Sequence, residues 1–134
     1  MDDAPDDDAL LELAREARAD AVVPYSEFRV GSALATSDGA TYTGANLEVS
    51  NYSNSLHAEE VALARALMDG ERRFDAVAVA SSEPPLITPC GMCRQTLAEY
   101  CTSDLRVVCE AGDGAETFTL GDLLPAAFGG DALE

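Results

Sequence analysis

A short link near the carboxyl end constrains the fold of this chain more than any other feature. Residues 105–109 and 117–120 have the apolar pattern of strands, and the link between them, 110–116, contains Gly112 and Gly114. A parallel connection between neighbouring strands needs a dozen or more residues, usually including a helix. The link is too short for a helix, so we expect the fourth and fifth strands to pair antiparallel.

The rest of the chain alternates helical and strand patterns. Apolar residues at helical spacing predict a first helix over 9–21, and further helices are expected at 57–68 and about 91–100. Strands are expected at 28–36, 41–49 and 74–80, and a helical segment interrupted by Pro125 follows the fifth strand. This order predicts an α/β fold in one domain, a three-layer α/β/α sandwich with a mixed five-stranded sheet. Residues 1–8 are expected to be an acidic, flexible tail, and residues 9–134 the folded domain.

The charge balance limits the partners of this chain. Its 134 residues include 25 acidic side chains against 8 basic ones, all of them arginine, for a net charge of −17. Such a surface repels phosphates, which argues against nucleic acid as a partner and favours a small, uncharged ligand. The sequence has no secretory signal and no apolar run of membrane-spanning length, so we expect neither secretion nor a membrane partner. A large carboxylate excess also suits a salt-rich cytoplasm, where ions screen the repulsion.

Three potential metal ligands stand where two of the helices are expected to begin. They are His57, which is the only histidine, and the pair Cys90 and Cys93. A helix N-terminus presents free N–H groups and a positive dipole end, which favour the thiolate that binds zinc. Three protein ligands leave one tetrahedral position open, which is typical of a catalytic zinc site. Cys101 and Cys109 match no ligand spacing, and we expect them to be small buried hydrophobic residues.

Each part of this set has a simpler interpretation when it is taken alone. A lone histidine is more often a satisfied surface or core residue than a ligand. The two cysteines alone could form half of a structural zinc knuckle or a redox dithiol. Glu59 alone would be a solvated carboxylate on a helix. A structural site has no use for a carboxylate beside an open coordination position, and a redox dithiol has no use for His57, so the combination favours catalysis.

The order H-x-E followed by P-C-x-x-C is the signature of zinc-dependent deaminases, and both halves are present here. Replacing a ring amino group by oxygen requires hydroxide at neutral pH, and zinc lowers the pKa of bound water from about 15.7 to about 7. It also requires two proton transfers. Glu59, two residues after His57, is the candidate base that takes a proton from the water, passes it to the ring nitrogen and then protonates the leaving amine.

The chain resembles the cytidine deaminase family from about residue 24 to residue 128. The matching segments are PYSEFRVG at 24–31, NLE at 46–48, PCGMCRQ at 89–95 and LLPAAF at 123–128. In the family, the first segment carries a phenylalanine that packs against the nucleoside, and the second carries an amide and a carboxylate that hold the ribose hydroxyls. A tyrosine closes the same binding stretch, and the last segment carries an aromatic side chain that reaches the site of a neighbouring subunit. The substrate-binding residues implied here are Phe28, Asn46, Glu48, Tyr52, Ala58 and Phe128.

These residues also have ordinary structural roles open to them. Phe28 and Phe128 would by default be core aromatics, and Asn46 with Glu48 could cap the end of a strand. Arg94 is expected to donate to a thiolate of the metal site, although apart from the motif it would be a surface arginine.

The sequence departs from the family pattern at His57 and Glu60. Short members often have cysteine and arginine at these two positions. Three thiolates on zinc sum to a charge of −1 and benefit from a nearby arginine, whereas two thiolates and a neutral histidine sum to zero. Histidine therefore removes the need for arginine, and the pair is expected to be a compensated substitution that leaves the site active, with a changed pH optimum.

The resemblance implies hydrolytic deamination of cytidine and deoxycytidine to the uridine products, with release of ammonia, as in pyrimidine salvage. It implies one Zn²⁺ per chain and a homotetramer with shared active sites. Deaminases of tRNA, DNA, deoxycytidylate and drugs of the blasticidin type are the alternatives within the superfamily. The −17 charge and the antiparallel link disfavour polynucleotide substrates, no basic cluster suggests a phosphate pocket, and blasticidin-type drugs are the runner-up to cytidine.

Overall fold

The computed structural model describes residues 4–82, 86–112 and 114–130, without the side chain of Tyr52. Helix α1 (Asp7–Ala17) and a 3-10 turn, η1 (Arg18–Asp20), precede the hairpin of strands β1 (Val30–Thr36) and β2 (Thr41–Ala45). A second 3-10 turn, η2 (Tyr52–Asn54), leads to α2 (Ala58–Met68), which is followed by β3 (Phe74–Ser81) and α3 (Gly91–Tyr100). Strands β4 (Arg106–Ala111) and β5 (Gly114–Thr119) and a last helix, α4 (Leu120–Leu123), complete the fold.

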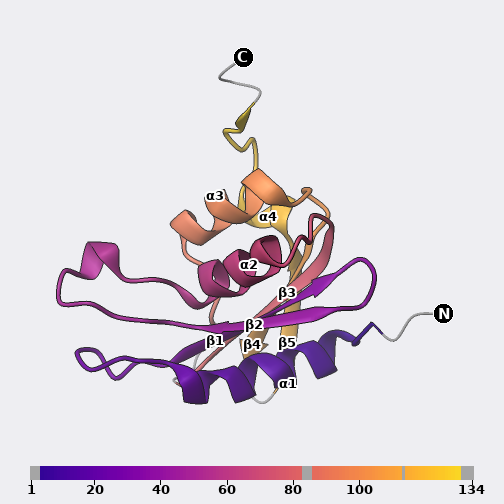
Figure 1. Ribbon diagram of the computed structural model, residues 1–134. Helices are drawn as coiled ribbons and strands as arrows, with labels where there is room; N and C mark the ends of the chain where they lie inside the picture. The colour runs from indigo at the N-terminus through magenta and orange to yellow at the C-terminus, as the bar shows by residue number, and fades with distance from the viewer. Residues whose placement is uncertain (1–3, 83–85, 113, 131–134) are drawn as a thin grey trace.

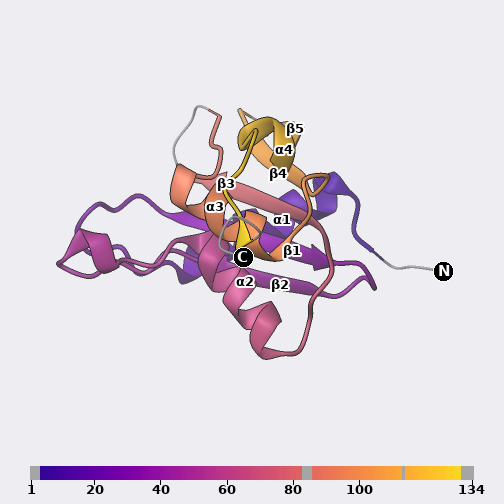
Figure 2. The same cartoon turned by 90° about the horizontal axis from the view of Figure 1, so that it is seen from above.

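The five strands form one mixed sheet in the order β2-β1-β3-β4-β5. Only β3 and β4 pair in parallel, and the connection between them contains α3; the other three pairings are antiparallel. Helix α1 covers one face of the sheet, and α2, α3 and α4 lie over the other (Figures 1 and 2). The predicted three-layer sandwich with antiparallel β4 and β5 is therefore confirmed.

Each face of the sheet has its own apolar core. On the side of α1 the core is built mostly from small side chains, with Leu10 and Leu11 of the helix against alanines of β1 and β3. On the other side, larger residues such as Leu63 of α2, Leu97 of α3 and Val77 of β3 fill the space. Strand β3, at the centre, is buried from Ala76 to Ser81, as the apolar pattern of 74–80 indicates for a strand covered on both faces.

The structure corrects the expected tail and several element ends. Helix α1 begins at Asp7 because the Asp6 carboxylate accepts the N–H of Ala9 at 2.8 Å and caps the helix. Residues 7 and 8 therefore belong to the fold rather than to the expected tail of residues 1–8, of which 1–3 lie outside the described residues. None of the helices in the described part of the chain is long and apolar enough to cross a membrane.

The strands also differ from their expected lengths. Strand β5 starts at Gly114 and ends at Thr119, instead of running from 117 to 120, because pairing with β4 continues to the turn at Gly112, where φ is +63°. The strand expected at 28–36 starts later, at Val30, and the strand expected at 41–49 ends earlier, at Ala45. The residues beyond these two ends form loops that flank the candidate site.

Candidate metal centre and active site

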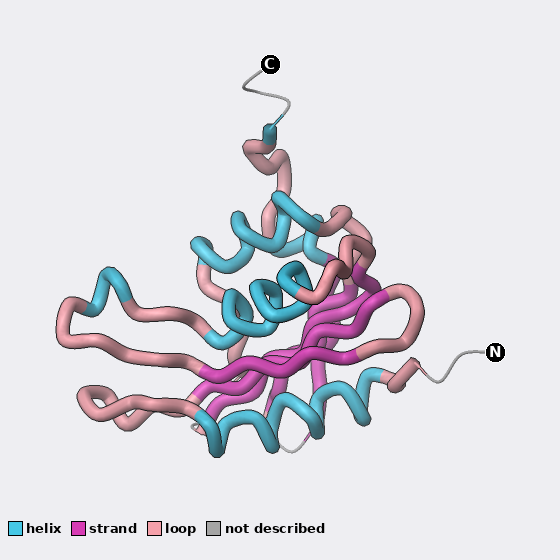
Figure 3. The backbone as a smooth tube through the Cα atoms, in the orientation of Figure 1, coloured by secondary structure: helices cyan, strands magenta, loops and turns pink. Residues whose placement is uncertain are grey.

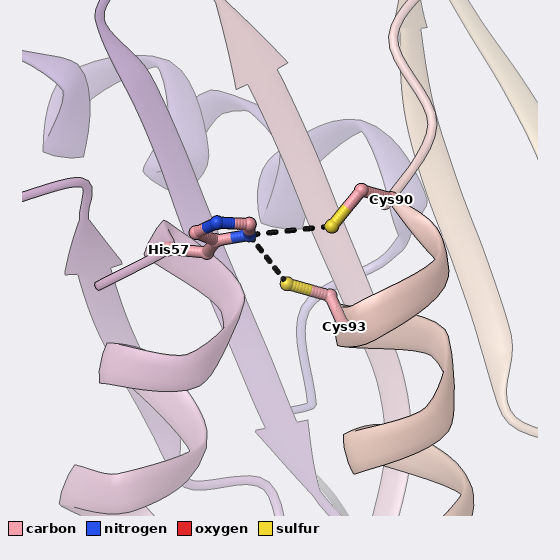
Figure 4. A group of neighbouring side chains, drawn as sticks. All are labelled: His57, Cys90 and Cys93. Carbon is pink, nitrogen blue, oxygen red and sulfur yellow. Dashed lines mark hydrogen bonds between the residues drawn. The ribbon is translucent and has the colours of Figure 1, made fainter. Parts of the chain in front are cut away.

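The three expected ligands converge at the N-termini of α2 and α3. His57 is the N-cap of α2 and Cys90 is the N-cap of α3, while Cys93 lies in the first turn of α3. The His57 Nδ1 atom lies 3.2 Å from the Cys93 Sγ and 3.3 Å from the Cys90 Sγ (Figure 4). All three potential ligand atoms lie within 4.8 Å of one another. The sequence prediction of a three-residue cluster is thus matched by the geometry.

The separations and the surroundings fit a zinc ion. Zinc binds nitrogen at about 2.0 Å and sulfur at about 2.3 Å. In a tetrahedral arrangement a nitrogen and a sulfur ligand therefore lie about 3.6 Å apart, close to the two distances from the His57 Nδ1 to the cysteine Sγ atoms. Burial and the neighbouring Glu59 carboxylate raise the pKa of the Cys93 thiol. A thiolate at this position therefore needs a compensating cation, and two sulfurs with one imidazole are a donor set that zinc prefers.

Glu59 lies in the first turn of α2, two residues after His57, and its exposed fraction is 5%. Burial is the main cause that raises the pKa of its carboxyl group. The side chain lines a cavity of about 240 Å³ together with His57, Ala58 and Cys90. The cavity thus joins the metal ligands to a buried carboxylate, which is the combination that proton transfer beside a metal requires.

Only some of the nucleoside-binding residues expected from the sequence line the cavity. Phe28, Asn46 and Ala58 line the cavity, whereas Glu48 and Phe128 are absent from its described lining. Sequence reasoning missed Val30, Ile87 and Thr88, which also line it. The signals available in the sequence were that Val30 lies within the matching segment 24–31 and that Ile87 and Thr88 directly precede the segment 89–95. Neither signal shows which side chains face the cavity, because these residues come from a strand end and a loop whose path the sequence does not specify.

Phe28 and Phe128 are not core aromatics, since they are 36% and 59% exposed. Phe128 lies on the segment after α4 that rises away from the body of the molecule (Figure 1). Its backbone carbonyl accepts a hydrogen bond from Gln95 of α3 at 2.8 Å. The segment is thereby anchored while its aromatic side chain stays exposed. The side chain of Tyr52 lies outside the described residues.

Asn46 and Glu48 are both bound to the loop that carries Phe28. The Asn46 amide donates to the Phe28 carbonyl at 2.9 Å and accepts from the Val30 N–H at 3.0 Å. Glu48 accepts from the backbone N–H groups of Tyr25 and Ser26, each at 3.1 Å. Asn46 therefore does tie strand ends together, as one interpretation of the sequence had it, and it does so while lining the cavity.

Arg94 takes a different position from the one expected. Its guanidinium donates to the Pro89 carbonyl at 2.7 Å, to the Leu123 carbonyl at 2.7 Å and to the Thr88 hydroxyl at 3.0 Å. Within the described residues it donates to no thiol. Arg94 instead ties the loop before Cys90 to the end of α4, so it holds the cysteine half of the site in place through the backbone.

A larger hollow, of about 710 Å³, lies elsewhere, between α2, β2 and the loop that joins them. Its lining includes the exposed side chains of Leu56 and Met68 and none of the metal ligands. The size of a hollow therefore does not identify the active site here; the chemistry of the smaller cavity does.

Comparison with known proteins agrees with this geometry. Residues 4–109 match a family model described as the cytidine and deoxycytidylate deaminase zinc-binding region. The chain belongs to this family. It is a zinc-dependent deaminase, and zinc is the cofactor that the cluster of His57, Cys90 and Cys93 suits.

Individual relatives cover nearly the whole chain. A cytidine deaminase of Sporosarcina psychrophila is 42% identical over 130 residues, which are 96% of this chain and 95% of the relative. The crystal structure of cytidine deaminase from Burkholderia pseudomallei has a TM-score of 0.87 at 42% identity and covers 90% of this chain and 98% of that one. For the enzyme from Mycobacterium tuberculosis the TM-score is 0.82 at 38% identity, with 93% and 98% covered.

Proposed function

We propose that this protein hydrolyses the exocyclic amino group of free cytidine and deoxycytidine, giving uridine or deoxyuridine and ammonia. The observation that carries the proposal is the placement of the buried Glu59 carboxylate in one cavity with His57 and Cys90. Phe28 and Asn46 in the wall of that cavity supply an aromatic surface and an amide for a nucleoside. The family and its named relatives support the same substrate class.

In this proposal His57, Cys90 and Cys93 hold one Zn²⁺. The ion, when bound, supplies an activated water at neutral pH. Glu59 would take one proton from that water and give it to the ring nitrogen as the hydroxyl oxygen adds to the ring carbon. It would then take the second proton from this hydroxyl group as the carbonyl forms, and give it to the amine, which leaves as ammonia. Burial suits this role, because the raised pKa of the Glu59 carboxyl group lets it hold a proton between the two transfers.

We also propose that the active form is a homotetramer in which Phe128 enters the site of a neighbouring copy. The exposed Phe128 on its anchored segment supports this. The cavity of about 240 Å³ lies below the range of roughly 300–1,000 Å³ common for small-molecule sites, so a group from outside can complete it. The apolar hollow beside α2 offers a surface that a second copy can cover.

The test is ammonia release from cytidine by the zinc-loaded protein in high-salt buffer, compared with Glu59→Gln. We expect turnover by the parent and a loss of about a thousandfold or more in the variant, because a shuttle that acts in both proton transfers is removed. Zinc content, measured on both proteins, should stay at one ion per chain, since the substitution of an amide for this carboxylate leaves the three ligands in place.

The matched control is Glu60→Gln. Glu60 follows Glu59 in the same helical turn, and its carboxylate accepts the N–H of His57 at 3.0 Å. An amide oxygen can accept the same bond, so this variant should keep activity within about tenfold of the parent.

Absence of turnover by a folded, zinc-loaded parent would overturn the substrate assignment, and blasticidin-type drugs would then be tested next. Zinc loading that survives His57→Ala would contradict the ligand set.

A further inference from the structure

The hydroxyl group of Ser26 connects Phe28, which the proposed function places at the nucleoside, with Glu48, for which the family resemblance implies a contact with the ribose. It donates a hydrogen bond to the Glu48 Oε2 atom. It also accepts the backbone N–H of Phe28 at 3.0 Å. Phe28 belongs to the described lining of the cavity and Glu48 does not, so Ser26 joins a residue of the cavity wall to a carboxylate on the loop after β2.

The loop around Ser26 is fixed at several further points. Glu27 has a φ of +60°, a left-handed conformation that is uncommon for a residue with a side chain, and its N–H donates to the Val23 carbonyl at 3.1 Å. On the far side of Phe28, its carbonyl accepts from the Asn46 amide. The loops before β1 and after β2 project from the same end of the sheet (Figure 3). Ser26 therefore bridges two loops at a place where the backbone is already held.

Among the described residues, the hydrogen bonds leave the Glu48 carboxylate with one free acceptor position. An ionised carboxylate has about four acceptor positions. Two are taken by the N–H groups of Tyr25 and Ser26 on Oε1, and one by the Ser26 hydroxyl on Oε2. The hydrogen bond from the Ser26 side chain is the main cause that lowers the pKa of Glu48. The carboxylate is thus ionised at neutral pH, and its remaining acceptor position is on Oε2.

We propose that Ser26 is a positioning residue for sugar recognition, whose hydroxyl holds the Glu48 carboxylate so that the free position on Oε2 accepts a ribose hydroxyl. This inference rests on the proposed function, because it takes a nucleoside as the ligand. Ser26 itself does not touch the reacting atoms. It acts by fixing the rotamer of Glu48 and, through the N–H of Phe28, the distance between the carboxylate and the aromatic wall.

The experiment compares Ser26→Ala with the parent on cytidine and on 2′,3′-dideoxycytidine, which lacks the 2′ and 3′ hydroxyls of the ribose and keeps the 5′ hydroxyl. We expect kcat/KM for cytidine to fall about tenfold further than kcat/KM for the dideoxy substrate, the size of one hydrogen bond to a charged group. The loss on cytidine should be mainly a rise in KM, since zinc and Glu59 are untouched. Ser26→Thr keeps the hydroxyl, and it should restore most of the selectivity for the hydroxylated sugar.

Ser82→Ala is the matched control. Ser82 is exposed, and its hydroxyl also accepts a backbone N–H, from Arg29 at 3.1 Å, but no hydrogen bond joins Ser82 to Glu48 or Phe28 among the described residues. This variant should leave the ratio of kcat/KM for cytidine to kcat/KM for the dideoxy substrate unchanged. If Ser26→Ala lowers kcat/KM equally for both substrates, or for neither, the role of Ser26 is only structural. That result would overturn the inference while the proposed function stands. Failure of the parent to deaminate cytidine would overturn both.

Discussion

The imidazole of His57 and the thiols of Cys90 and Cys93 meet because each stands at or just inside a helix start. Their sequence spacing predicted this meeting, since both motifs open helical patterns. The contacts of Ser26 and Arg94 were not predictable in the same way. Arg94 follows a metal ligand, which suggested a bond to sulfur, yet three oxygens from two chain segments take its donors. Such partners depend on how loops fold back, which has no periodic signal in sequence.

The four cysteines should differ sharply in reactivity. Burial raises the pKa of Cys101 and of Cys109 from 9.0 to about 12, and the thiolate is the reactive form. Their thiolate fraction at pH 8 is therefore about a hundredfold or more below that of an ordinary thiol. Cys90 is exposed and Cys93 is buried. In zinc-loaded protein we expect slow reaction at all four, and after zinc is removed by a chelator, rapid reaction at Cys90 first.

A chromogenic disulfide reagent measures these rates, and mass spectrometry identifies the modified residue. Cys109→Ala is the control, because it removes a buried thiol without touching the cluster and should leave the fast phase intact. Rapid modification of Cys90 while zinc stays bound would contradict its assignment as a ligand.

At the scale of elements, the position of α2 depends on a close approach to β2. A Cβ atom added at Gly44 would lie 2.5 Å from the Ala62 nitrogen and closer still to the Ala58 carbonyl oxygen, both in the backbone of α2. Gly31 has the same relation to α1, through the Ala14 carbonyl. The helical and strand patterns predicted these elements, but neither pattern shows that glycine sets the spacing between a helix and the sheet.

Gly44→Ala should therefore damage the metal site as well as stability. Overpacking of this kind costs about 1–3 kcal/mol of unfolding free energy, and here it displaces the start of α2 next to His57. Gly31→Ala is the matched comparison, because it displaces α1 on the opposite face of the sheet. We expect both variants to lose stability in urea, and Gly44→Ala alone to lose zinc affinity, measured by competition with a chromogenic chelator. An equal loss of zinc affinity in the two variants would show that the site responds to global stability only.

At the scale of the whole molecule, the net charge of −17 stands against few ion pairs. Among the described residues only three carboxylates, those of Asp7, Glu12 and Glu110, lie in salt bridges. Glu110 is the most connected: it binds Arg15 at 2.6 Å and accepts the N–H of Ser81, so it holds α1 to the end of β3. The remaining acidic side chains repel one another, and the repulsion grows when copies of the chain assemble into the proposed tetramer.

Salt should therefore stabilise both the fold and the assembly. Between 0.1 M and 1 M the Debye length falls from about 10 Å to about 3 Å, which screens exposed carboxylates from one another. We expect about 2 M KCl to raise the midpoint of thermal unfolding by at least about 5 °C over dilute buffer, roughly 1 kcal/mol for a domain of this size. Light scattering at the same salt concentrations should show that the molecular mass in solution rises with salt toward that of four chains.

Screening can be separated from the general effect of salt on apolar burial by removing charge. A suitable variant carries amides at four exposed acidic positions outside every described ion pair, Glu16, Asp20, Glu99 and Glu116, which changes the net charge from −17 to −13. If repulsion between carboxylates causes the effect of salt, this variant should be more stable than the parent in dilute buffer. Its midpoint of thermal unfolding should also rise less on addition of KCl. Equal gains in the two proteins would mean that the salt acts on apolar burial and that the acidic surface has no part in it. A smaller gain in the variant would support a chain adapted to the salt-rich surroundings that its composition predicts.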